Sequence, residues 1–181
     1  MDLNAVINTR KREYIHVTNT LALTAARAFE HLPPPSEEFT FVYVSGEGAT
    51  HKPGISTPLF GRVKGQTEVN LMNLKTEASR LRPISVRPAF VDVIAHDEIK
   101  PWVPPQTGLR HVFIAGLAAL VRHFWTSTHS PTEPLGSFLA GLACGGFDGQ
   151  LTGAGIDVYG SSPIISNVGF RRLMRLDGSP K

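Results

Sequence analysis

Three residues close together in the sequence have the types and the spacing that could perform chemistry. Ser45 directly follows the apolar run "FTFVYV", and Lys64 comes four residues after Phe60 in "FGRVKGQTE". In a helix, residues four apart lie on one face, so positions 60 and 64 can address one ligand together. A polar residue placed just after an apolar strand lies where open parallel sheets bind their ligands. The pattern therefore predicts a site built from Ser45, Phe60 and Lys64.

The elements that must hold this site form a strand, a helix and a second strand. Residues 39–46 are β-branched and aromatic and end in glycine, which predicts a buried strand. Apolar residues recur at helical spacing from Pro58 to about Leu81, and residues 83–93 predict another short strand that Pro88 ends or bends. A strand, helix and strand of these lengths predict two parallel strands in one sheet, so the fold class is α/β.

The flanking segments predict further helices and one hairpin. Residues 14–32 have a helical apolar pattern that ends at three consecutive prolines, and residues 109–125 and 132–144 predict two more helices. Glycines between 145 and 160 predict turns and a short hairpin, and the tail predicts a strand followed by a helix with Ser166 or Asn167 as its N-cap.

The composition narrows the class of protein. With 181 residues, 41% of them hydrophobic and 18% charged, the chain is long enough for one globular domain. The formal net charge is only +3 and the basic residues are scattered along the chain, which argues against a nucleic-acid partner. The most apolar window is too short to span a membrane. One cysteine cannot form an intrachain disulfide, and the histidines lack metal-ligand spacing. The sequence predicts a cytoplasmic location with no metal and no membrane association.

The quoted residues, with "ISVRPAFV" after them, resemble an atypical or extended short-chain dehydrogenase/reductase of the nucleoside-diphosphate-sugar-epimerase-like kind. The ending "LGSFLAGLACGGFDGQLTGAGIDVYGSSPIISNVGFRRL" is similar to the C-terminal part of fungal members, and the likeness runs from about Tyr14 to Leu176. The resemblance implies that Ser45 orients a substrate oxygen and that Lys64 supplies a positive charge and holds the ribose of NADP or NAD. It implies an oxidoreductase acting on a small organic carbonyl or alcohol, in fungal secondary metabolism.

The sequence departs from that family at two points. Phe60 stands where the family has tyrosine, and phenylalanine has no exchangeable proton, so water, His51, Thr57 or Tyr43 would have to replace it. The glycine-rich turn of the nucleotide-binding half is also missing. The chain is therefore predicted to be a single truncated domain, with residues 1–93 forming the sheet and 94–181 the substrate side: a partial Rossmann-like fold.

These departures leave several hypotheses open. A truncated sheet would keep only about two or three strands and would expose an apolar edge, which predicts a homodimer or a partner chain that covers it. Besides the oxidoreductase, the chain could be a non-catalytic remnant or binding protein, or a cofactor-independent isomerase that uses His51 as a base. In each case Phe60 and Pro88 are expected to line the substrate pocket.

Overall fold

The computed structural model describes residues 3–77, 80–93, 96–103 and 128–177. The helices are α1 (Leu3–Ile15), the π-helix η1 (His16–Thr20), α2 (Leu21–Phe29), α3 (Leu59–Glu77), the 3-10 helix η2 (Asp97–Trp102), α5 (Thr132–Ala143) and α6 (Asn167–Leu173). The strands are β1 (Phe39–Val44), β2 (Leu81–Arg87), β3 (Phe90–Asp92), β4 (His129–Pro131), β5 (Ile156–Tyr159) and β6 (Ser162–Ser166). The helix expected at 109–125 lies outside the described residues.

The main sheet has the strand order β1-β2-β6-β5. The strands β1, β2 and β6 run parallel, with Val44 beside Val86 and Val86 beside Ile165, and β5 pairs antiparallel with β6. This mostly parallel sheet, flanked by helices, confirms the predicted α/β, partial Rossmann-like fold class. It has more strands than the two or three expected, because the β5–β6 hairpin joins it, so the sheet is not confined to residues 1–93.

The predicted strand at 83–93 is divided into two strands that belong to different sheets. β2 ends at Arg87, and after Pro88 the chain enters β3, which pairs in parallel with β4. Proline has no N–H to donate to a neighbouring strand, and the next free N–H, that of Ala89, donates to the Ser130 hydroxyl at 2.9 Å. The strand therefore leaves the main sheet at Pro88, beside the expected site.

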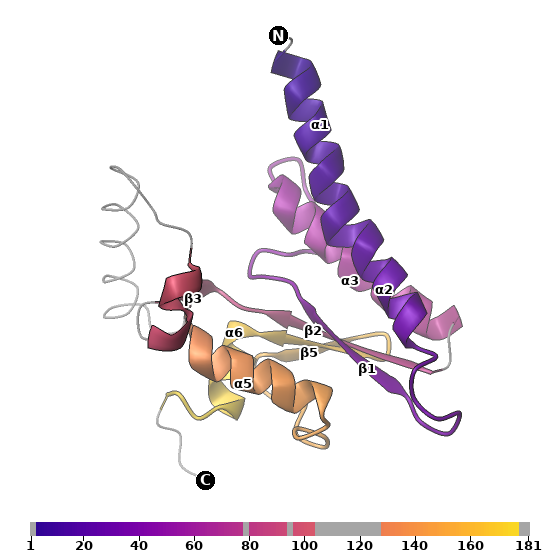
Figure 1. Cartoon of the computed structure of the whole chain (residues 1–181), viewed down its shortest axis with the longest axis vertical. Helices are drawn as coiled ribbons and strands as arrows, with labels where there is room; N and C mark the ends of the chain where they lie inside the picture. The colour runs from indigo at the N-terminus through magenta and orange to yellow at the C-terminus, as the bar shows by residue number, and fades with distance from the viewer. Residues whose placement is uncertain (1–2, 78–79, 94–95, 104–127, 178–181) are drawn as a thin grey trace.

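Helices cover opposite faces of the main sheet (Figure 1), and an apolar cluster lies between sheet and helices on each face. Side chains alternate along a strand, so Ile84 and Val86 point to one face, where they pack with Phe138 of α5 and Phe170 of α6. On the other face Tyr43 and Leu81 pack with Ala26 of α2 and with Leu71 and Leu74 of α3. The sheet is thus the middle layer of three.

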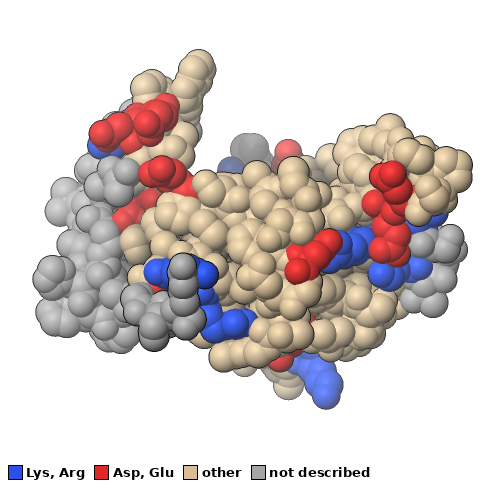
Figure 2. Space-filling view, turned by 90° about the horizontal axis from the view of Figure 1, so that it is seen from below, with Lys and Arg blue, Asp and Glu red and all other residues tan. Residues whose placement is uncertain are grey.

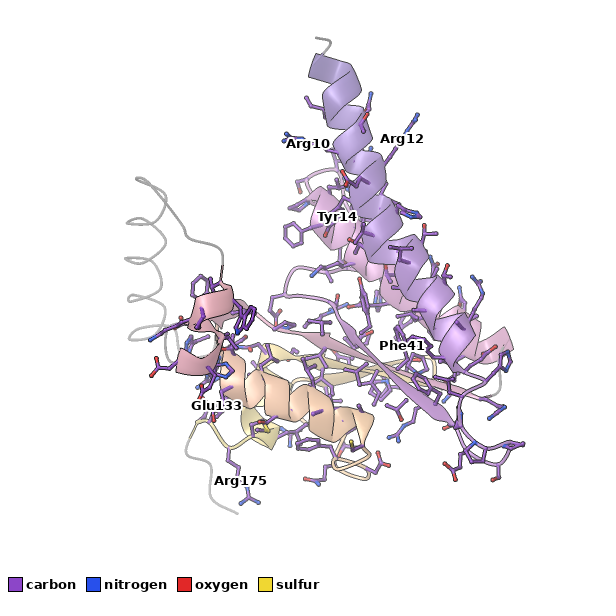
Figure 3. The ribbon with its side chains drawn as sticks, viewed as in Figure 1. Arg10, Arg12, Tyr14, Phe41, Glu133 and Arg175 are labelled. Atoms are coloured by element: carbon purple, nitrogen blue, oxygen red, sulfur yellow. The ribbon has the colours of Figure 1, made fainter. Side chains whose placement is uncertain are left out.

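The first helices form one continuous rod that extends beyond the sheet (Figure 1). The rod begins at Leu3, well before the predicted start at residue 14, and its last α-helix ends at Phe29, ahead of the three prolines. Figure 3 shows Arg10 and Arg12 projecting from α1 away from the sheet. The face seen in Figure 2 carries basic and acidic residues interspersed among uncharged ones.

Within the described ranges, β1 is an edge strand, because β2 is its one neighbour in the sheet. The sequence predicts an edge of this kind and a homodimer or partner chain covering it, and the partner stays a prediction. No helix in the described part of the chain is long and apolar enough to cross a membrane.

Candidate functional site

A cavity of about 850 Å³ lies where β1 and β2 end, and we call it the strand-end pocket. Because β1 and β2 are parallel, the segments after both strands meet at one edge of the sheet. The pocket is lined by residues 44–47, 88–91, Phe60 and Lys64 of α3, Thr128, and Val168 of α6. Four predicted site residues, Ser45, Phe60, Lys64 and Pro88, are therefore brought to one cavity.

Lys64 is the cation of the strand-end pocket. Its Nζ donates a hydrogen bond to the backbone oxygen of Ser45 at 2.5 Å. Burial lowers the pKa of Lys64 below its usual value of 10.5, and the charge of Glu68, one turn further along α3, partly opposes that shift. The ammonium is thus held at the end of β1 with its remaining protons available to a ligand.

Ser45 presents its backbone rather than its hydroxyl to Lys64. Alternation along β1 puts the side chain of residue 45 on the same face as Tyr43, toward α3. The side chain is 1% exposed, and its oxygen has no hydrogen-bond partner of normal geometry among the described residues. That oxygen nevertheless lies close enough to the Glu68 carboxylate to help lower the pKa of Glu68. The predicted role of the Ser45 hydroxyl in orienting a substrate has no geometric support here.

Phe60 shares the pocket with Lys64, as the four-residue spacing predicts. Its ring is 44% exposed and lies over Gly48, where a β-carbon would come within 3.4 Å of the ring. Gly48 has a φ of 85°, a conformation that side-chain-bearing residues rarely adopt, so glycine serves both the turn and the ring contact. The aromatic ring contributes an apolar wall to the pocket.

The residues expected to replace the missing tyrosine do not line this pocket. Tyr43 is buried, its hydroxyl lies 3.4 Å from the backbone oxygen of Thr18, and burial raises its pKa to about 12. His51 and Thr57 are also absent from the lining. His51 therefore does not fit the predicted role of a base in the old substrate pocket, because the loop after β1 places it against Glu68 instead.

Glu47 is a pocket residue that sequence reasoning missed. It lines the cavity, and its Oε1 accepts a hydrogen bond from the backbone N–H of Asn167, at the start of α6, at 2.9 Å. The motif Gly46-Glu47-Gly48, directly after a strand, is a signal that could have found it, because polar residues at strand ends face the ligand crevice. Among the described residues, the pocket lining thus has one carboxylate and one ammonium.

The wall formed by residues 88–91 is fixed by a buried polar network. The Ser130 hydroxyl, which accepts from Ala89, donates to Asn167 Oδ1 at 2.6 Å. Asp92 and His129 add a contact of 3.0 Å between a carboxylate oxygen and Nε2. These bonds connect β3, β4 and α6, and so position the pocket wall.

A second group of polar side chains consists of Glu68, Arg87 and His51, which comes from the loop after β1. We call it the Glu68 cluster. Arg87 donates to both carboxylate oxygens of Glu68, from Nε at 2.9 Å and from Nη2 at 2.5 Å. His51 Nε2 lies 2.6 Å from Glu68 Oε2. Burial by itself would raise the pKa of Glu68, but hydrogen bonds from Arg87 and His51, the nearby Ser45 hydroxyl and the charge of Arg87 hold it below its usual value. Glu68 is therefore ionised at neutral pH.

The fold and the pocket define a class: an α/β protein with a Rossmann-like, mostly parallel sheet and a ligand-sized cavity at its strand ends. The chain belongs to the same family as the botcinic acid biosynthesis cluster B protein 16 of Botryotinia fuckeliana. The two are 48% identical over 157 residues, which cover 86% of this chain and 99% of that protein.

A second relative is the leucinostatins biosynthesis cluster protein T of Purpureocillium lilacinum, 27% identical over 187 aligned positions. The alignment covers 91% of this chain and 64% of the relative's own length. No protein-family model matches the chain. No solved structure is significantly similar to it.

Proposed function

We propose that this protein binds a small organic carbonyl or alcohol compound of a fungal secondary-metabolite pathway in the strand-end pocket. Two relatives, named for the biosynthesis of botcinic acid and of leucinostatins, support a place in secondary metabolism. The volume of about 850 Å³ falls in the range of pockets that take small molecules.

The observation that carries this proposal is the uncovered apolar surface around the two charges of the pocket. Four of the apolar side chains that line it are substantially exposed: Val44 46%, Phe60 44%, Val91 44% and Val168 47%. When a ligand covers apolar surface that faces water in a concave site, the burial favours binding by about 25 cal/mol per Å². A largely apolar ligand with one or two oxygen atoms matches this lining.

Lys64 and Glu47 supply opposite polar contacts to such a ligand. The Lys64 ammonium has protons left for a carbonyl or alcohol oxygen, since one proton serves the Ser45 backbone. The contact between Glu47 and Asn167 uses Oε1, so the second carboxylate oxygen, Oε2, can accept from a ligand hydroxyl. The pocket can therefore bind and polarise a carbonyl oxygen.

The first test is the substitution Lys64→Met, which keeps the aliphatic stem and removes the charge. We expect acetophenone, used as a small aromatic ketone probe, to bind about tenfold more weakly, the effect of losing one hydrogen bond from a charged donor. Protein-observed NMR titration measures the affinity. Binding to the unmodified protein should also weaken as the pH rises through the pKa of Lys64, because the donor charge is then lost.

The matched control is Lys100→Met, because Lys100 is a half-exposed lysine that is paired with Asp97 and does not line the pocket. It should bind acetophenone as the unmodified protein does. Equal affinities for the two methionine variants would show that Lys64 takes no part in binding and would contradict the proposal.

The second candidate function is an oxidoreductase related to the short-chain dehydrogenases/reductases, using NADP or NAD. The observation in its favour is that Ser45, Phe60 and Lys64 converge on one cavity in the spacing that resembles that family. The residues present fit the cofactor in part. Lys64 could hold ribose hydroxyls. The short glycine-rich turn between strand and helix that cradles the pyrophosphate is not found in the described ranges, and the connection from β1 to α3 is a long loop, residues 45–58.

The substitution Phe60→Tyr tests this second candidate. A phenol at position 60 places an exchangeable proton one helical turn from the Lys64 ammonium, which favours the ionised form. If the chain binds NADPH, the variant should consume it with acetophenone at least 100-fold faster than the unmodified protein. This factor is about the lower end of the rate enhancements that one general acid or base provides. Absorbance of NADPH measures the rate.

Phe60→Leu is the control, since it changes the packing of the wall without adding a proton, and it should show no gain. Calorimetric titration with NADPH and NADH separates binding from turnover. Cofactor binding without a gain in Phe60→Tyr would favour a non-catalytic binding protein, and no cofactor binding would remove the oxidoreductase from consideration.

A further inference from the structure

The Glu68 cluster borders a second cavity, of about 370 Å³, that the proposed function does not use. Its lining includes His51 and Lys52 from the loop after β1, Arg87 from β2, and Asp157 and Tyr159 from β5. None of these residues lines the strand-end pocket. The volume lies at the small end of the range for small-molecule sites.

The hydrogen bonds of the cluster fix the proton on His51. An ionised carboxylate only accepts, so Nε2, 2.6 Å from Glu68 Oε2, must carry the proton and donate it. The contact of 3.3 Å between Arg87 Nη2 and the same Nε2 then joins two donors and is no hydrogen bond. In the neutral ring, Nδ1 is left with a lone pair and has no hydrogen-bond partner among the described residues. This is the arrangement of a carboxylate-oriented histidine base.

Arg87 offers a matching donor. Its Nε and Nη2 are both engaged by Glu68, which leaves Nη1 without a hydrogen-bond partner in the described part of the chain. The guanidinium stays charged, and Lys52 adds a second cation to the same lining. Glu68 is satisfied within the cluster, so a negative charge that develops on a ligand oxygen would face Arg87.

Tyr159 supplies a flat apolar wall. Its ring centroid lies 4.3 Å from that of His51, and the residue is 40% exposed. A planar ligand can stack against this ring while a hydroxyl on the ligand reaches the imidazole. Asp157, on the same strand, is the one carboxylate among the described residues of the cavity lining.

We propose that His51, Arg87 and Tyr159 form a second binding site that takes the hydroxyl of a planar phenol or enol. The ligand oxygen gives its proton to Nδ1 of His51, which becomes an imidazolium held by Glu68. The resulting phenolate or enolate accepts a hydrogen bond from Nη1 of Arg87. On release the proton returns to the ligand oxygen, so the step is balanced and needs no other reactant.

The test uses 4-nitrophenol, because its neutral and ionised forms absorb at different wavelengths. Below the pH at which the free probe ionises, we expect saturable appearance of the phenolate absorbance as the protein is added. His51→Gln keeps a donor for Glu68 but lacks the base, and should reduce the phenolate signal at saturation at least tenfold. Tyr159→Leu removes the stacking wall without touching the buried ion pair, and should weaken binding severalfold.

A matched control is His96→Gln, since His96 contacts Thr132, away from the cavity, and it should retain the full signal. Nitrogen NMR of the His51 ring gives an independent readout: the unliganded Nδ1 should show the shift of an unprotonated nitrogen and should become protonated when the probe binds.

Three results would overturn the proposal. The first is no saturable signal with the unmodified protein. The second is an unchanged signal in both His51→Gln and Tyr159→Leu. The third is a signal lost in Lys64→Met but kept in His51→Gln, which would place the probe in the strand-end pocket. Circular dichroism of each variant shows whether a lost signal reflects unfolding, and Tyr159→Leu keeps the test decisive if His51→Gln fails to fold. The outcome is independent of the acetophenone titration.

Discussion

Replacing Arg87 with methionine should lower the free energy of unfolding by about 3 kcal/mol at neutral pH, because it leaves the Glu68 carboxylate buried without its cation. The Glu68 side chain is 1% exposed and Arg87 donates to both of its oxygens. The loss is placed at the lower end of the range for broken buried ion pairs, since His51 still donates to Glu68. Urea unfolding measures the change.

The pH dependence of this loss follows from the pKa of Glu68. In the intact cluster that pKa lies below 4.5, so the stability from the ion pair is present above the ordinary pKa and is lost as the pH falls through the folded value. Without Arg87, less opposes the effect of burial, so the pKa of Glu68 should be higher in the variant than in the intact cluster and Glu68 should take up a proton more readily. The difference in the free energy of unfolding between the two proteins should therefore shrink as the pH is lowered toward the pKa of an ordinary glutamate.

Two further variants test the cause. Arg82→Met breaks an ion pair of 2.5 Å with Asp148, whose side chain is 55% exposed, and should lower the free energy of unfolding far less than Arg87→Met does. The double variant Arg87→Met, Glu68→Leu removes both charges and should be more stable than Arg87→Met alone. If Arg87→Met is as mild as Arg82→Met, the pair contributes little and the cluster does not stabilise the fold.

Local patterns predicted the parts of the fold that depend on neighbouring residues. The β-branched run of β1, the helical spacing of α3 and the proline that ends β2 each have a short-range physical cause. The pairing of β6 with β2 joins residues about eighty positions apart, and a short apolar run does not identify such a partner. This is why the sheet was expected to be smaller than it is.

Sequence patterns brought several candidate residues to one cavity, but they did not give the direction of the Ser45 side chain or the position of His51. Spacing correctly brought Phe60 and Lys64 to one cavity, and the end of β1 brought Ser45 there. The same alternation that buries Tyr43 turns the Ser45 side chain toward α3, which a strict period-two reading of residues 39–45 could have shown.

The Glu68 cluster carries a weaker signal in the sequence. A glutamate inside a helix is most often solvated, so its type and position do not mark Glu68 as buried. Arg87 and His51 come together with it only in three dimensions.

The packing of the loop that carries His51 leads to the second large effect, the substitution Gly65→Ala in α3. Alanine in a helix is ordinarily favoured over glycine by up to about 1 kcal/mol. Here a β-carbon on Gly65 would overlap the backbone of Thr50, and backbone cannot rotate aside as a side chain can. We expect a net loss of about 2–3 kcal/mol in the free energy of unfolding, as for other overpacked sites.

The clash also has a local consequence, since Thr50 is the neighbour of His51. Moving the loop away from α3 should lengthen the contact between His51 and Glu68, and 4-nitrophenol binding should fall with it. Gly136→Ala in α5 is the control: a β-carbon there would meet no atom of the described residues within 4 Å, so that variant should gain stability. If Gly65→Ala lowers the free energy of unfolding and Gly136→Ala raises it, then the contact with the loop, and not helix propensity, decides the effect at position 65. A gain in both would mean that the loop yields at little cost, and that His51 is not held against Glu68 by the close approach of α3.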